Sequence, residues 1–141
     1  MIERELNEAI YRLTRLGYRI TPQRIFITRL ILERIESHPS FMDIHEEAKK
    51  ILPHIGISTT YNTVKMLEDA GIIATFEVDG KTHLDRPHPH VNIICRDMGK
   101  IIDLKDDDVV ATIESLLARN NIQAKGSKIL IYTHCGNASL T

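Results

Sequence analysis

The sequence predicts an α+β fold: a helical N-terminal domain over residues 1–84 that ends in a β-hairpin, a hinge over residues 85–90, and a small α/β domain over residues 91–141. The first observation is a run of four segments before the hairpin in which apolar residues recur at spacings of three and four, as on one face of a helix. The second is Asp79-Gly80 between two short apolar stretches, which favours a hairpin. Helices that lead into such a two-stranded wing form the winged helix-turn-helix plan.

The first two helices are predicted over residues 3–16 and 22–36. The first has one apolar stripe and ends at Gly17, where a left-handed residue can close a helix. The second begins at Thr21-Pro22, because threonine caps a helix and proline at the next position gives up an N–H that would have no partner there. Its apolar residues cover most sides, so we expect it at the centre of the first domain.

The third and fourth helices form the rest of the helical group. The third follows His38-Pro39 with Ser40 as its cap, and the fourth is predicted over residues 57–70 with Gly56 or Ser58 as its cap and Gly71 at its end. The inward stripe of the fourth helix comprises Ile57, Thr60, Val64 and Leu67. Its outward arc comprises Ser58, Thr59, Tyr61, Asn62 and Lys65.

The outward arc of residues 57–70 has side chains that suit a DNA major groove. Hydroxyls and amides bond to phosphates or base edges, and a tyrosine ring can contact a thymine methyl. A solvated helix face would have a similar composition. The hairpin that follows favours the DNA interpretation, in which this segment is the recognition helix and Lys81 of the wing lies near the DNA backbone.

Basic residues are concentrated near the start of the chain, although the formal net charge of the whole chain is −1. That overall balance argues against a general nucleic-acid binder. Residues 12–29, however, contain no Asp or Glu and five arginines: Arg12, Arg15, Arg19, Arg24 and Arg29. We expect Arg15, Arg19 and Arg24 to lie near DNA phosphates.

The second domain has the pattern strand, strand, helix, strand. The strands are predicted over residues 91–95, 100–104 and 128–134, and acidic residues 106–108 begin a helix that runs to about residue 119. A unit of about 50 residues buries too little apolar surface to be stable alone. We therefore expect a homodimer in which two copies of this domain pair.

Composition excludes several classes of protein. No run approaches the roughly 18–20 apolar residues of a membrane span, and the charged N-terminus is not a signal peptide, so we expect a cytoplasmic protein without a membrane partner. Cys95 and Cys135 are too few for the disulfide framework of a secreted protein, and we expect both to be small buried core residues. A structural zinc site of four thiolates is expected to be absent.

Side chains that a divalent metal accepts cluster around the predicted hinge: His38, Asp85, His88, His90 and Asp103. On an extended chain the two histidines of His88-Pro-His90 lie on one face. Mixed nitrogen and carboxylate ligands suit Mn²⁺, Fe²⁺ or Zn²⁺. A hydrolytic metal centre is the alternative, but the sequence offers no nucleophile, oxyanion donor or enclosed pocket for it, so we expect a chain that is not an enzyme.

These motifs together resemble the ferric uptake regulator (Fur) family. The matching segments occur in order along nearly the whole chain, and such a series is more specific than any one motif. They are residues 19–24, His38-Pro39, residues 59–63 and 67–72, His88-Pro-His90, residues 95–101, Asp103 and residues 132–135.

The resemblance implies a dimeric, metal-responsive transcriptional repressor of metal-homeostasis or peroxide-stress genes, with one regulatory divalent metal per chain. Its partner would be double-stranded DNA with an AT-rich palindromic operator. The family's ligand positions match His38, Asp85, His90 and Asp103. The carboxylate at Asp103, and Asn62 after Tyr61, lean toward the peroxide-sensing branch.

The sequence departs from the family pattern at three places. A usual ligand histidine falls on Asn92, so either Asn92 is a poor ligand or His88 and His90 take both places. Met98 and Ala138 stand where the family has zinc-binding cysteines, and Ser127 stands where it has a further histidine. A winged-helix regulator with a decayed metal site, responding to another signal, is therefore the alternative function.

Overall fold

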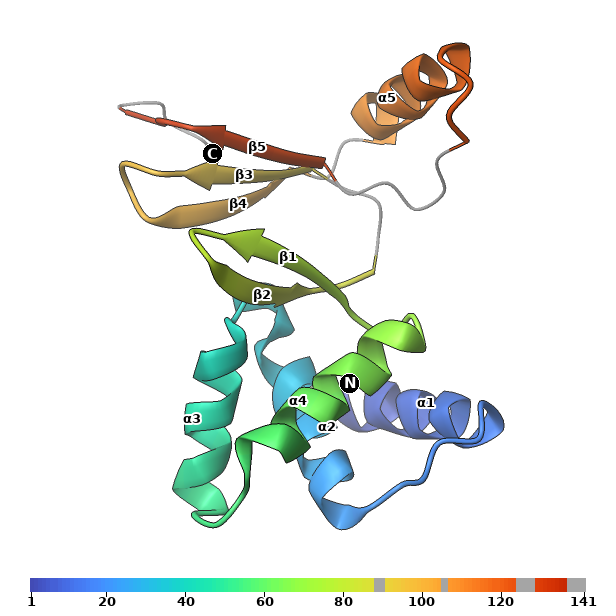
Figure 1. Cartoon of the computed structure of the whole chain (residues 1–141), viewed down its shortest axis with the longest axis vertical. Coiled ribbons are helices and arrows are strands. Elements are labelled where there is room, and N and C mark those ends of the chain that lie inside the picture. The colour runs from blue at the N-terminus through green and yellow to red at the C-terminus, as the bar shows by residue number, and fades with distance from the viewer. Residues whose placement is uncertain (88–90, 105–106, 124–128, 137–141) are drawn as a thin grey trace. The chain divides into compact units, whose positions relative to one another are not determined.

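The computed structural model describes residues 1–87, 91–104, 107–123 and 129–136, and the chain divides into two compact units, Met1–Pro87 and His88–Thr141 (Figure 1). Each unit has its own secondary structure and its own core, so each is described by itself. Within the described ranges, no helix is both long and apolar enough to cross a membrane.

The first unit begins with a group of helices: α1 (Ile2–Arg15), α2 (Pro22–Arg34), the short 3-10 helix η1 (Ile35–Ser37), α3 (Phe41–Ile51) and α4 (Ile57–Asp69). The predicted caps are present. Thr21 accepts a hydrogen bond from the Arg24 amide at 3.2 Å. Ser40 and Asp43 form a reciprocal capping box at the start of α3. Helix α4 begins at Gly56 without a side-chain cap, so the amides of its first turn receive no side-chain acceptor from the cap residue.

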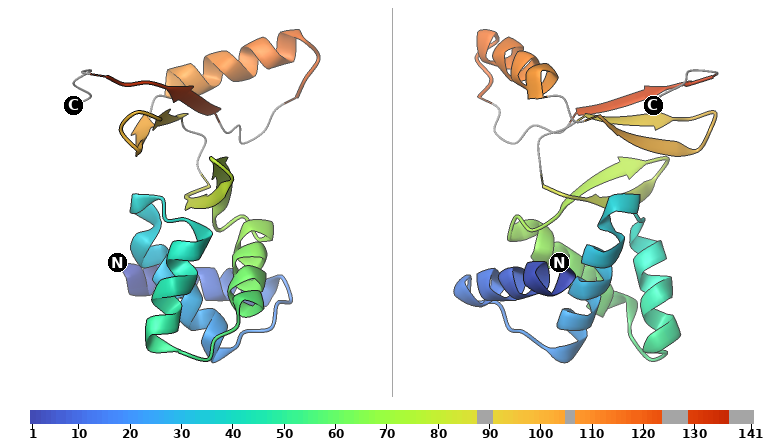
Figure 2. Two further views of the ribbon diagram at one scale, coloured as in Figure 1. Left: turned by 60° about the vertical axis from the view of Figure 1, so that its left-hand side comes forward. Right: turned by 180° about the vertical axis from the view of Figure 1, so that it is seen from behind.

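Helix α2 supplies the centre of the first unit, as its apolar sequence predicts. Ile27 and Ile31 are fully buried in a cluster that also contains Leu13 of α1, Ile44 of α3 and Leu67 of α4. Because α2 contacts residues from every other α-helix of the unit, its position fixes the arrangement of α3 and α4. Figure 1 shows α4 crossing α2, and Figure 2 gives two further views of the same group of helices.

The predicted wing is an antiparallel hairpin of β1 (Ala74–Val78) and β2 (Lys81–Asp85). Asp79 and Gly80 form its turn with φ of 49° and 78°. Positive φ at both central positions is the conformation that gives a two-residue turn the twist of its strands. Strand β2 runs to Asp85, one residue further than the sequence predicts.

The second unit is a three-stranded sheet with strand order β4-β3-β5, together with α5 (Asp107–Arg119). Strand β3 (Val91–Cys95) pairs antiparallel with β4 (Lys100–Leu104) and parallel with β5 (Ile129–Thr133). A parallel pair needs a long crossover between its strands, and α5 lies within that connection. Only Val110 of α5 is buried.

Two expectations from the sequence are wrong, and one ion pair was not foreseen. Cys95 is buried as expected, but Cys135 is half-exposed and the two form a disulfide instead of remaining separate residues. Ile57 does not pack inward, because 53% of its surface is exposed at the uncovered start of α4. The unforeseen pair joins Arg29 to Glu3: the guanidinium lies 2.5 Å from a carboxylate oxygen of Glu3, and the hydrogen bond that Arg29 donates lowers the pKa of that carboxyl.

Candidate metal centre and nucleic-acid interface

His38 and Asp85 come together at the end of the first unit. His38 follows η1 and Asp85 is the last residue of β2, and both side chains are more than nine-tenths buried. The His38 Nε2 atom lies 3.5 Å from Oδ1 of Asp85. The structure therefore brings together two of the five predicted metal-ligating residues, from positions 47 apart in the sequence.

Backbone contacts hold the two residues in place. The Leu84 amide donates to the Pro39 carbonyl at 2.8 Å, and Ser40 forms a β-bridge with His83, so the segment after η1 adds to the edge of the wing. Nδ1 of His83 donates to the His38 carbonyl at 2.8 Å. His38 itself has φ of 53° in the left-handed region, which non-glycine residues adopt mainly where surrounding contacts enforce it.

The donor atoms of this pair suit a borderline divalent ion. An imidazole nitrogen and a carboxylate oxygen are ligands that Mn²⁺, Fe²⁺ and Zn²⁺ all accept. Two donors bound to one ion at about 2.1 Å with tetrahedral angles lie about 3.4 Å apart, close to the observed separation of 3.5 Å. Asp85 Oδ1 also accepts the Arg86 amide at 2.7 Å, which orients the carboxylate.

The other predicted ligands belong to the second unit. Asp103 on β4 is the cross-strand partner of Asn92 on β3, so these two positions lie side by side in the sheet. Asn92 is buried and Asp103 is half-buried. His88 and His90 lie outside the described residues.

The outward arc of α4 is largely exposed, as predicted. Ser58, Tyr61, Asn62 and Lys65 are exposed, whereas Thr59 is half-buried and accepts the Thr63 hydroxyl through its carbonyl at 2.7 Å. The exposed residues lie on the helix that would enter a groove in DNA.

A row of rings positions the tyrosine of this arc. The Tyr61 ring meets the Phe41 ring edge to face at 6.2 Å, and Phe41 stacks parallel to His45 at 6.4 Å. His45 Nδ1 lies 2.8 Å from the Thr60 hydroxyl, and both side chains are buried. Helices α3 and α4 are thus joined by one buried polar contact and by a stack that ends at Tyr61.

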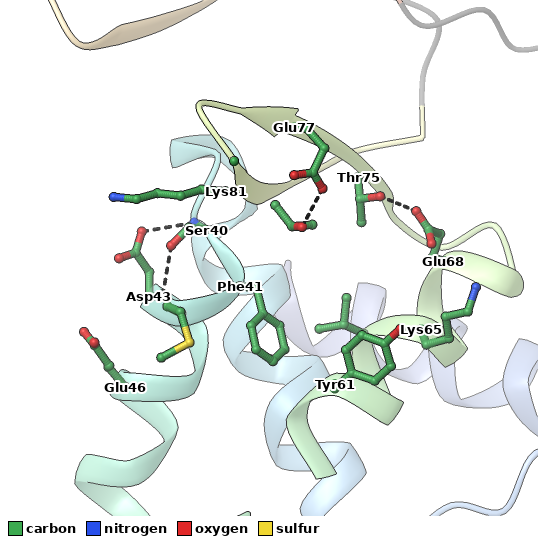
Figure 3. Close-up of a pocket in the computed structure, with 14 residues that line it drawn as sticks. Ser40, Phe41, Asp43, Glu46, Tyr61, Lys65, Glu68, Thr75, Glu77 and Lys81 are labelled. Carbon is green, nitrogen blue, oxygen red and sulfur yellow. Dashed lines mark hydrogen bonds between the residues drawn. The ribbon is translucent and has the colours of Figure 1, made fainter. Parts of the chain in front are cut away.

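A cavity of about 580 Å³ lies between α3, α4 and the wing (Figure 3). Its lining includes both lysines predicted to contact DNA, Lys65 and Lys81. It also includes four carboxylates: Asp43, Glu46, Glu68 and Glu77. Lys65 is paired with Asp69 at 3.4 Å as well. Phosphate would be repelled by this acidic lining, so the start of α4 is the more favourable part of the arc for DNA.

The predicted phosphate-contacting arginines lie around the end of α1 and the start of α2. Arg15 and Arg19 are exposed, and the Arg15 guanidinium stacks over the Tyr11 ring at 5.8 Å. Arg24 is half-buried and donates to the Arg19 carbonyl at 2.6 Å. This hydrogen bond from Arg24 therefore helps to fix the conformation of the loop that contains Arg19.

Comparison with known proteins decides the family. The profile described as "Ferric uptake regulator family" matches residues 15–132, which is most of the chain. The chain belongs to this family. Members of the family are transcription regulators rather than enzymes, in agreement with the prediction from the sequence.

Relatives of this Fur-family chain include sensors of different signals. The peroxide-responsive repressor PerR of Staphylococcus aureus strain USA300 is 36% identical over 106 residues, which cover 74% of this chain and 71% of that protein. The crystal structure of the Vibrio cholerae ferric uptake regulator has a TM-score of 0.67 at 25% identity, covering 87% of this chain and 96% of that one. A zinc-bound manganese uptake regulator has a TM-score of 0.63 at 30% identity, covering 88% and 96%. These likenesses confirm the predicted fold class, a winged helix-turn-helix domain followed by a small α/β dimerisation domain.

One feature of this Fur-family chain has no local sequence signal. The Arg86 guanidinium lies 2.5 Å from a Glu36 carboxylate oxygen and 3.3 Å from one of Glu5. Burial alone would lower the pKa of Arg86, but the hydrogen bonds that its guanidinium donates to Glu36 and Glu5 raise it. Arg86, the residue after Asp85, therefore forms ion pairs with η1, which precedes His38, and with α1. These ion pairs could not be predicted from the sequence, because the two carboxylates lie 50 or more positions from Arg86 and no repeating pattern links them to it.

Proposed function

We propose that this chain is a metal-responsive transcriptional repressor of iron, manganese or peroxide-stress genes, acting in the cytoplasm as a homodimer on double-stranded DNA. The buried His38–Asp85 pair is the observation that carries the proposal. An imidazole and a carboxylate withdrawn from water at 3.5 Å are favourable chiefly when a charge or proton between them compensates for their desolvation. A divalent ion is the compensation that a Fur-family regulator would use.

The proposed site takes one regulatory divalent metal per chain. His38 and Asp85 supply two ligands, and Asp103, His88 and His90 are the proposed remaining ligands. When bound, the metal supplies positive charge that draws these donors to one point. The chain's own part is to keep His38 and Asp85 oriented, through the His83 hydrogen bond and the Arg86 amide. Regulation would follow if the metal-bound state has the higher affinity for DNA.

The proposed DNA interface is the exposed arc of α4 with the arginines that flank α2. Ser58, Tyr61 and Asn62 would meet base edges of an AT-rich palindromic operator, and Arg15, Arg19 and Arg24 would lie near phosphates. The remaining predicted contacts are Thr59, Lys65 and Lys81. The acidic cavity beside Lys65 and Lys81 makes these two lysines weaker candidates than the start of the helix.

The second unit supports the proposed homodimer by its incomplete core. Leu116 of α5 and Ile131 of β5 are 45% and 43% exposed. Apolar side chains exposed to this extent on a small sheet and its helix are typical of a surface covered by another subunit.

The test is a titration of Mn²⁺, anaerobic Fe²⁺ or Zn²⁺ into chelator-treated protein, with bound metal and affinity for an AT-rich palindromic duplex measured on the same samples. We expect one metal per chain and a gain in DNA affinity of about tenfold or more, a coupling free energy of about 1.4 kcal/mol. Equal DNA affinity in metal and in chelator would contradict the metal-responsive function and leave a winged-helix regulator with another signal.

Matched variants locate the site. His38→Asn removes the imidazole while keeping a residue that tolerates the left-handed conformation, and Asp85→Asn keeps the acceptor for the Arg86 amide. Both should abolish the metal-dependent gain. His54→Asn and Asp79→Asn, at exposed positions of the same unit, should leave it unchanged.

A parallel pair of variants tests the DNA interface. Tyr61→Ala should reduce the preference for operator over random duplex, because a base-reading contact is lost. Arg19→Ala should weaken binding to every sequence and reduce the slope of affinity against salt by about one. Ile51→Ala, at an exposed position of α3 outside the proposed interface, is the control.

A further inference from the structure

The two cysteines of the chain meet at one corner of the second unit. Cys95 ends β3 and is fully buried, whereas Cys135 lies two residues beyond β5 and is half-exposed. Their Cα atoms are 5.3 Å apart and their sulfurs are bonded. The bond therefore joins the end of β3 to the segment that follows β5, and the two cysteines are 40 positions apart in the sequence.

Non-covalent contacts at the same corner hold the same two strands. The Asp97 carboxylate accepts hydrogen bonds from the amides of Cys135 and Gly136 at 2.9 and 2.8 Å. The Arg96 amide donates to the Thr133 carbonyl at 2.9 Å, and its guanidinium lies 5.0 Å from the centre of the Tyr132 ring. These contacts involve backbone groups and rings, so they do not need the sulfurs to be bonded.

Strand β5 depends on this corner more than the other strands do. Within the described part of a single chain, it lies at the edge of the sheet, next to β3, and its last three residues are exposed. An edge strand with little buried side-chain surface opens readily, because few apolar contacts oppose its separation. The disulfide is the one covalent restraint between β5 and its neighbour.

We propose that Cys95 and Cys135 form a reversible oxidation site, which reacts with small thiols and disulfides of the glutathione class and sets how firmly β5 is held on β3. The proposal stands independently of metal and DNA binding. One consequence does rest on the proposed homodimer: Ile131 of β5 belongs to the exposed apolar surface, so reduction would also weaken self-association.

Exposure sets the order of the exchange steps. The thiolate of Cys135 attacks one sulfur of glutathione disulfide, the sulfur–sulfur bond breaks, and its electron pair leaves with a glutathione thiolate. The buried Cys95 thiolate then attacks the Cys135 sulfur and releases the second glutathione. Two protein thiols and one glutathione disulfide thus give one protein disulfide and two glutathione thiols, which take up the two protons. Two electrons pass from protein to glutathione, and excess glutathione reverses the sequence.

The reduced state should be loosened rather than unfolded. Asp97 binds the backbone amides of Cys135 and Gly136, and those hydrogen bonds remain when the sulfur–sulfur bond is broken. The expected change is therefore faster opening of β5 with the first unit unaffected.

The experiment equilibrates the full chain, with chelator present, in buffers of defined reduced-to-oxidised glutathione ratio. Acid quenching and alkylation followed by mass spectrometry count free thiols, and hydrogen exchange is followed over residues 129–133. We expect a transition from two free thiols to none, and exchange in β5 about tenfold faster in the reduced protein. Exchange in α2 should not change.

Two variants distinguish the effect of losing the disulfide from the effect of changing a side chain at the same corner. Cys135→Ala, which changes the half-exposed partner and leaves buried Cys95 in place, should show fast exchange in β5 at every glutathione ratio. Met98→Ala, at an exposed position of the same corner, should behave as the unaltered protein does. Two free thiols at every ratio, or equal exchange with and without the bond, would overturn the proposal.

Discussion

The two units differ in how completely each buries its own apolar residues. In the first unit, the core around α2 includes fully buried side chains from α1, α2, α3 and α4. In the second unit, the buried apolar residues within the described ranges are Val91, Ile94, Cys95 and Val110, while Leu116 and Ile131 remain more than two-fifths exposed. The first unit has the interior of an independent domain, whereas the second leaves large apolar side chains exposed.

This difference indicates where each unit obtains its stability. Burial of apolar surface contributes roughly 25 cal/mol per Å², and the first unit obtains that contribution within one chain. The second unit compensates with a covalent bond, with charged hydrogen bonds at Asp97 and, in our proposal, with a second copy. The predictions below test this contrast, in order of decreasing expected effect.

The largest effect is expected in the core of the first unit. Ile31→Ala removes a fully buried side chain at the centre of α2 and should lower the free energy of unfolding by about 2–5 kcal/mol. Urea unfolding followed by circular dichroism measures it. Ile51→Ala, at a position 65% exposed, is the matched control and should change stability by less than about 0.5 kcal/mol. Similar decreases in the free energy of unfolding for both variants would show that burial around α2 is not the main source of stability in the first unit.

A smaller loss is expected at the polar contact between α3 and α4. Thr60→Val keeps the shape of the side chain but leaves His45 Nδ1 without its partner at 2.8 Å. An unsatisfied buried group costs about 1–3 kcal/mol, again measurable by urea unfolding. Thr14→Val, at an exposed position of α1, should be nearly neutral. A neutral Thr60→Val would show that packing alone joins the two helices.

In the second unit, substitution of an exposed apolar residue should affect association rather than folding. Leu116→Asp places a charge on the proposed dimer surface and should raise the dimer dissociation constant at least tenfold, about 1.4 kcal/mol. Sedimentation over a range of protein concentrations measures it. Ser115→Asp adds the same charge beside it on α5 and serves as control. Unchanged association of Leu116→Asp would place the interface elsewhere.

The smallest effect concerns pH and Asp97. Hydrogen bonds from the backbone amides of Cys135 and then Gly136 lower the pKa of this carboxyl. A depressed pKa means that the stabilisation is present above the unfolded value of 3.8 and is lost as pH falls below it. Asp97→Asn should therefore lower the melting temperature slightly at pH 7, with the difference shrinking below about pH 4. A difference independent of pH would exclude the charge as its cause.

Local signals explain why much of the first unit could be predicted. Thr21-Pro22 at a helix start and Asp79-Gly80 in a hairpin each act on their own backbone, so the residues themselves indicate the conformation. The proximity of His38 and Asp85 was predictable for another reason. His38 and Asp85 carry ligand chemistry, and the resemblance to a family indicated that they act together.

Contacts between distant side chains were not predictable in the same way. Ile57 has helical spacing with buried residues, yet it lies in the first turn, where no neighbouring element covers it. Glu3 pairs with Arg29, and Glu36 with Arg86, because folding brings α1, η1 and the end of β2 together. The bond between Cys95 and Cys135 likewise depends on the parallel register of β3 with β5. The alternation of apolar residues within each strand does not indicate how two strands pair.

The parallel pairing of β3 with β5 also has a consequence during translation. Because N-terminal domains fold first as a chain emerges from the ribosome, the core around α2 has all its partners before the second unit is synthesised. Strand β3 then emerges with β4 as a neighbour but must wait for α5 and β5. During that interval its other edge is open, and unpaired strand edges are sites of aggregation. A nascent chain at this stage would carry a finished winged helix and a sheet edge for a chaperone to protect.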